Sequence, residues 1–204
     1  YYDSSLFISE EVKDNFVNKQ VYLDKASINF LQEKLGFFPP IDKIVQFKIY
    51  APDQTSISYS SGFAIENINA QQKTQQAVDD LQYGNTHEFV HVFFYGTPVG
   101  RSWFEEGLAD YMQYIHMGST GLYCLENGWQ YGYYDNNGKF ISTTPFVPYS
   151  NFMVQWQNTE EFYDPLNMPS YYRSAECLWV YIEEKYGDES IKKVAQAWHN
   201  TRKI

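Results

Sequence analysis

His87-Glu88-Phe89-Val90-His91 is the stretch of sequence that decides how this chain is interpreted. On a helix, residues four apart lie on the same face, so both imidazoles can reach one ion from one side. Glu88 follows the first histidine, where its carboxylate can take a proton from a metal-activated water molecule. Apolar neighbours indicate a buried helix, in which two histidines and a glutamate need a reason to be present. The pattern therefore predicts a Zn²⁺ site with a general base.

A third zinc ligand has to come from another part of the chain, because catalytic zinc sites combine three protein ligands with one open position. No histidine follows at the spacing of an extended histidine motif, and His116 and His199 have no supporting motif. The next predicted helix, residues 103–117, carries two adjacent carboxylates, Glu105 and Glu106. An acidic first turn also suits the helix dipole, so these residues alone leave a non-metal explanation open.

Residues 103–109 follow the pattern W-x-x-E-G-x-A, which resembles the second zinc helix of the gluzincin metallopeptidases. This group contains thermolysin and the zinc aminopeptidases. The resemblance implies that Glu106 is the third zinc ligand, although Glu105 stands where the family usually has Asn. It also implies that Asp110, one turn later, hydrogen-bonds a zinc-bound histidine and fixes its orientation.

Residues 171–176, Y-Y-R-S-A-E, resemble the Y-x-K-G-A-E segment of zinc aminopeptidases, with Arg173 in place of Lys and Ser174 in place of Gly. The resemblance implies that Tyr171 donates a hydrogen bond to the oxyanion that forms during hydrolysis. Tyr172 would point about 100° away around the helix. Both side chains can instead be packing residues, since the chain has 19 tyrosines.

Phe63-Ala64-Ile65-Glu66-Asn67 resembles, more weakly, the G-A-M-E-N segment of the same enzymes. The favoured interpretation is an edge strand that binds an extended peptide substrate through its backbone. In the other interpretation, Glu66 binds the free α-amine of the substrate and makes the enzyme an aminopeptidase.

The composition excludes several classes of function. The chain has 204 residues, a net charge of -10 and 19% aromatic residues. Nucleic-acid binding needs clustered Lys and Arg, so no nucleic-acid partner is expected. No run of about 18 apolar residues exists, so no membrane span is expected. Cys124 and Cys177 can form one disulfide or remain two buried thiols, and the sequence does not decide between them.

The order of predicted elements indicates an α+β fold. Gly36 ends a first helix for which Asp24 is the expected N-cap. The predicted elements are helices at 24–35, 71–94, 103–117, 171–186 and 189–200, strands at 43–50 and 57–69, and a hairpin turn at 136–138. We therefore expect one zincin-like catalytic domain over 1–204 with two lobes. A small mixed sheet and the active-site helix would form the lobe 1–95, and a mainly helical lobe would follow over 96–204.

Together these patterns predict a zinc-dependent peptidase that acts on peptide or protein substrates. The alternative is a catalytically weak or silent zincin-fold module that binds a protein partner through its aromatic surface. The acidic composition, the possible disulfide and a first residue, Tyr1, that is not Met favour a secreted or cell-surface protein.

Overall fold

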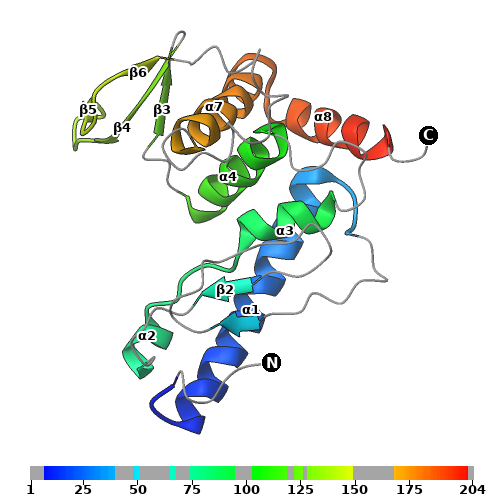
Figure 1. The fold of residues 1–204 in the computed structure, drawn as a ribbon. Coiled ribbons are helices and arrows are strands. Elements are labelled where there is room, and N and C mark those ends of the chain that lie inside the picture. Colours follow the sequence, from blue (N-terminus) through cyan, green and yellow to red (C-terminus); the bar gives the residue numbers. More distant parts are fainter. Residues whose placement is uncertain are drawn as a thin grey trace. The chain divides into compact units, whose positions relative to one another are not determined.

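A computed structural model describes residues 7–39, 48–50, 65–67, 74–94, 103–118, 122–125, 128–148 and 168–201 of the chain. The chain divides into two compact units (Figure 1). The first consists of residues 1–100 and 198–204, and the second of residues 101–197. Each unit is described by itself below.

The first unit is built on the long helix α1, Glu10–Leu35. Ser9 caps its start by accepting a hydrogen bond from the Val12 amide, and Gly36 ends it in the left-handed conformation with φ 74°. The predicted end of the helix is confirmed, whereas the prediction that Asp24 caps its start was wrong. Asp24 lies buried in the middle of α1. The helix begins earlier because Ser9 caps it and the residues that follow Ser9 already have helical periodicity.

Two short helices replace the single helix that was predicted over residues 71–94. These are α2, Gln75–Asp79, and α3, Thr86–Phe93, and both pack on α1. The chain between them approaches α1 so closely that a Cβ at Gly84 would lie 2.6 Å from the Leu23 carbonyl oxygen. A side chain at this position would therefore collide with the backbone of α1, so glycine is the residue that fits here.

The first unit also contains a parallel pair of short strands, β1, Lys48–Tyr50, and β2, Ile65–Asn67. Both lie within the segments predicted as strands, and the remainder of those segments is outside the described residues, as is Ala64. In the register of the pair, Ile49 is opposite Glu66.

The second unit has a helical core of α4, Trp103–Met117, and α7, Met168–Tyr186. At Gly107 the two helices are so close that a Cβ would lie 2.5 Å from the Ala175 carbonyl carbon. Trp179 is fully buried, and its indole N–H donates to the Phe104 carbonyl at 3.0 Å. The predicted helix over 103–117 is confirmed, and the glycine of the W-x-x-E-G-x-A pattern has a packing role.

Four antiparallel strands accompany these helices. They are β3, Leu122–Leu125; β4, Gly128–Tyr134; β5, Phe140–Ser142; and β6, Val147–Pro148. The predicted hairpin turn at 136–138 is confirmed. It joins β4 to β5, with Gly138 at φ 76° and the Asp135 carboxylate accepting the Asn137 and Lys139 amides.

The last helix, α8, Asp188–Asn200, follows α7 after a break at Gly187. Gly187 has φ 82°, and its amide donates to the Glu183 carbonyl at 2.7 Å, so the predicted end of α7 is also confirmed. None of the described helices is long and apolar enough to cross a bilayer.

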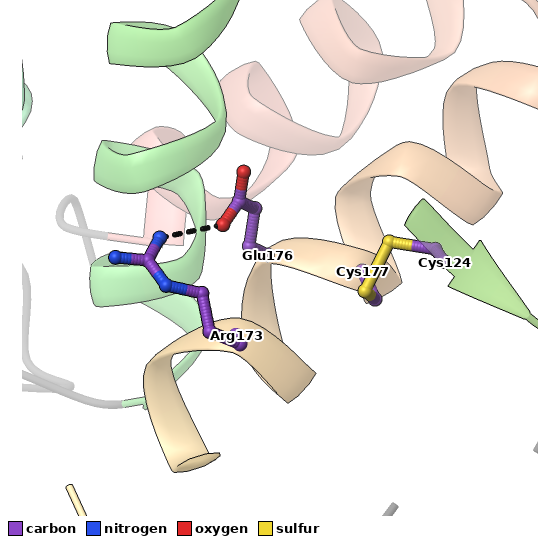
Figure 2. Close-up of a disulfide and its surroundings, with 4 residues drawn as sticks. All are labelled: Cys124, Arg173, Glu176 and Cys177. Atoms are coloured by element: carbon purple, nitrogen blue, oxygen red, sulfur yellow. Dashed lines mark hydrogen bonds and ion pairs between the residues drawn. A yellow bond between two sulfur atoms is a disulfide. The ribbon is translucent and has the colours of Figure 1, made fainter. Parts of the chain in front are cut away.

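A disulfide joins Cys124 of β3 to Cys177 of α7, with their Cα atoms 5.4 Å apart (Figure 2). Around it, Leu122 and Trp129 form a small buried cluster. The bridge therefore attaches the sheet to the helical core of the second unit. Of the two alternatives that the sequence left open, a disulfide or two buried thiols, the structure has the disulfide.

We expect replacement of both cysteines by serine to lower the free energy of unfolding by about 2–4 kcal/mol, because the bridge restricts the unfolded chain. The sequence separation that it spans is 53 residues. Urea unfolding of the parent and the double variant measures the difference, and reduced parent protein should reproduce it. An unchanged urea midpoint in both cases would show that the bridge does not stabilise the fold.

Candidate metal centre

The helix α3 presents the two histidines of the motif. His87 and His91 occupy positions four apart, and their rings lie with centroids 5.2 Å apart and planes at 74°. His91 is 2% exposed, and the helix buries Phe89 and Val90 beside it. The predicted helical context of the motif is confirmed.

Helix α4 carries the carboxylates that the sequence offered as a third ligand. Glu105 and Glu106 are both buried in its first turn. His87, His91 and Glu106 each offer one ligand atom, and these three atoms lie within 4.8 Å of one another. One ion can be about 2.0–2.2 Å from three such atoms only when they are this closely grouped. Among the described residues, the group includes neither Glu105 nor another histidine.

The two other histidines have different surroundings. His199 stacks on Phe37 with ring centroids 4.0 Å apart. His116 lies in the last turn of α4, where burial lowers the pKa of its imidazole. The ring stacking gives His199 a structural role that needs no metal.

The donor atoms fit zinc in kind and number. Two imidazole nitrogens and one carboxylate oxygen are the ligand set of a catalytic zinc site with an open position. Glu106 is 2% exposed, and carboxylates are rarely buried to this extent unless a cation or hydrogen-bond donors compensate them. One carboxylate oxygen of Glu88 is also buried and has no hydrogen-bond partner among the described residues. Such an atom is typically satisfied by an ordered water molecule or an ion.

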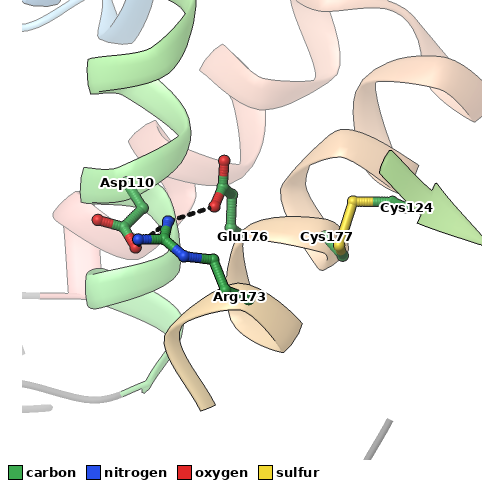
Figure 3. A network of polar contacts seen from close by, with 5 residues as sticks. All are labelled: Asp110, Cys124, Arg173, Glu176 and Cys177. Atoms are coloured by element: carbon green, nitrogen blue, oxygen red, sulfur yellow. Dashed lines mark hydrogen bonds and ion pairs between the residues drawn. A yellow bond between two sulfur atoms is a disulfide. The ribbon is translucent and has the colours of Figure 1, made fainter. Parts of the chain in front are cut away.

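Asp110 takes part in a network of charged side chains in the second unit (Figure 3). Its carboxylate accepts a hydrogen bond from the Arg173 guanidinium at 2.8 Å, and the same nitrogen donates to Glu176 at 2.7 Å. The guanidinium also lies 5.3 Å from the Tyr114 ring centroid and 5.8 Å from that of Tyr131. The role of Asp110 beside a zinc-bound histidine stays a prediction.

Burial and charge shift the pKa values of this network in opposite directions. Burial lowers the pKa of Arg173, but the carboxylates of Asp110 and Glu176 outweigh it and raise that pKa above its usual value. Burial raises the pKa of Tyr131 to about 12, although the Arg173 charge opposes this. Arg173 therefore stays cationic and Tyr131 stays neutral throughout the physiological pH range.

The other proposed site residues are placed only by their backbone. Tyr171 lies in the first turn of α7, and Ile65 and Glu66 lie in β2, but their side chains are outside the described part of the chain, as is Ala64. Their roles stay predictions. The ion pair of Arg173 has a local signal in the sequence, since Arg173 precedes Glu176 by three helical positions, a spacing that favours such a pair.

No family model, no curated protein and no solved structure matches the chain significantly. The interpretation of the site therefore rests on its own residues and their placement.

Proposed function

We propose that this chain is a zinc-dependent peptidase. His87, His91 and Glu106 would hold the ion, and Glu88 would act as the general base. The observation that carries the proposal is the grouping of those three ligand atoms. Glu88 follows His87 directly in the sequence and has a buried carboxylate oxygen without a described partner. A purely structural zinc site has no need for such a base.

Zinc, when bound, would polarise the scissile carbonyl and lower the pKa of a water molecule to about 7. Glu88 would accept a proton from the attacking water and deliver it to the leaving amine. Tyr171 would donate its phenolic hydrogen to the oxyanion. Asp110, which Arg173 holds at 2.8 Å, would orient a histidine ligand. These roles describe a zincin-like α+β catalytic domain of the gluzincin type.

Digestion of a diverse peptide pool by the zinc-loaded chain, followed by mass spectrometry, tests the activity. We expect internal or terminal cleavages that disappear with a strong zinc chelator, persist with its non-chelating isomer and return when zinc is restored. A chain that binds zinc but cleaves no peptide would contradict the peptidase proposal and favour a silent binding module.

The strand β2 is the proposed docking site for an extended peptide, because such a peptide can add a further strand to the edge of a sheet through backbone hydrogen bonds. We therefore expect acetylation of the substrate N-terminus to change the cleavage rate by less than about threefold. Matched free and acetylated peptides measure this ratio. A loss of cleavage on acetylation would instead assign Glu66 to the substrate α-amine.

We also propose that the protein works outside the cytosol, at the cell surface or after secretion. The disulfide between Cys124 and Cys177 supports this, because such bonds persist in oxidising compartments. Fractionation of cells that produce the protein, with detection of its disulfide, tests this proposal. Reduced protein confined to the cytosol would contradict it.

A further inference from the structure

Helix α1 presents an unusual buried face in the first unit. Gln20, Asp24 and Ser27 follow one another at intervals of four and three residues, so they share one side of the helix. All three are buried, and Asp24 is 4% exposed. Buried helix faces are normally apolar, since an uncompensated polar group in the interior is costly. This polar face therefore needs a specific partner.

That partner is the beginning of α3, the helix that carries the metal motif. The Asp24 carboxylate accepts the backbone N–H of Asn85 at 3.3 Å, and Gln20 donates to the same oxygen at 2.9 Å. The Thr86 hydroxyl donates to the Ser27 hydroxyl at 3.0 Å. The two helices are packed against each other in this unit (Figure 1). Side chains of α1 therefore hold the first turn of α3.

The position of Asn85 gives this contact a consequence for Glu88. Asn85 is the N-cap of α3, and its own side chain makes no capping hydrogen bond. Glu88 is three residues later, at the position from which a glutamate commonly reaches back to the N-cap amide in a capping box. Here Asp24 takes that amide instead, and an oxygen of Glu88 has no described partner.

We propose that Asp24 is a positioning residue of the site, which occupies the Asn85 amide and so keeps the Glu88 carboxylate available as a general base. This inference rests on the proposed peptidase function. The negative charge of Asp24 also suits the N-terminus of α3. Because α3 has only 8 residues, it depends on such tertiary contacts to stay helical. Without Asp24, Glu88 would fold back and cap its own helix.

Steady-state kinetics of Asp24→Ala test the positioning role. A capping hydrogen bond is worth about 1–2 kcal/mol, so we expect kcat to fall roughly 5- to 30-fold as Glu88 turns to the vacant amide. KM should change by less than about twofold, because the substrate contacts are intact. Asp24→Asn keeps an acceptor oxygen and should restore most of kcat.

Val12→Ala is the matched control. Val12 also lies on α1 and is buried, but it packs in the apolar cluster with Phe7, Phe16 and Val78. It should lower stability without lowering kcat. An equal loss of kcat in Val12→Ala and Asp24→Ala, at equal loss of stability, would overturn the proposal. If Asp24→Ala does not fold, Asp24→Ser keeps a polar group but is too short to reach the amide, and the same comparison applies.

A double-mutant cycle in unfolding decides the inference even if the chain proves to have no peptidase activity. Glu88 can compensate for Asp24→Ala only when its carboxylate is present. We therefore expect Asp24→Ala to lower the folding equilibrium constant roughly fivefold more in a Glu88→Ala background than in the parent. Hydrogen exchange of the Asn85 amide should accelerate most in the double variant. Additive effects would overturn the proposal, whereas failure of the peptidase proposal alone would leave this coupling in place.

Discussion

Glu88→Gln is expected to lower the rate of peptide hydrolysis by about 10²–10⁴-fold while zinc binding stays within about twofold of the parent. The amide has nearly the shape of the carboxylate but cannot accept a proton from water. Glu88 lies between two residues that offer ligand atoms, yet it does not belong to the ligand group itself. The measurement is kcat for one peptide taken from the pool, together with the zinc content of each protein.

Glu105→Gln is the matched control for this experiment, because Glu105 is a buried carboxylate on α4 outside the ligand group. It should retain zinc and most of the parent's rate. Full activity of Glu88→Gln would remove the general base from the mechanism. Loss of zinc in Glu105→Gln would show that the wrong carboxylate was assigned to the metal.

Arg173→Met is expected to lower the free energy of unfolding by about 3–5 kcal/mol. Arg173 donates to both Asp110, 8% exposed, and Glu176, 0% exposed. Methionine keeps much of the volume but removes the cation that these two buried carboxylates share, and weaker compensation of a buried charge is costly. Urea unfolding measures the effect.

Two further variants separate charge from geometry. Arg173→Lys keeps the charge but lacks the planar fork of donors, so it should recover only part of the lost stability. Lys139→Met removes an exposed cation from the β4–β5 turn and should change stability by less than about 0.5 kcal/mol. Parental stability of Arg173→Met would mean that the network does not contribute to the fold.

Features of the fold that depend on local signals could be predicted from the sequence. The end of α1 at Gly36, the turn at Gly138 and the end of α7 at Gly187 each follow from a glycine that adopts a positive φ. The break between α2 and α3 could not be predicted in this way. It lies where Gly84 approaches the Leu23 carbonyl of α1 closely, a contact that the sequence does not reveal.

In the candidate site, too, features with a local pattern could be predicted from the sequence, and contacts between distant residues could not. The spacing of His87 and His91 was sufficient to place both on one helix face, while Glu106 needed the resemblance to a known motif. The contacts of Asp24 with Asn85 and of Asp110 with Arg173 could not be predicted from the sequence. They join residues 61 and 63 positions apart, and no periodicity in the sequence links such distant partners.

Zinc-edge anomalous diffraction from crystals of the full chain grown with zinc tests the central claim most directly. The account predicts one strong peak, about 2.0–2.2 Å from a ring nitrogen of His87, a ring nitrogen of His91 and a carboxylate oxygen of Glu106. Zinc held by other residues, or no peak at these three side chains, would contradict the proposed metal centre.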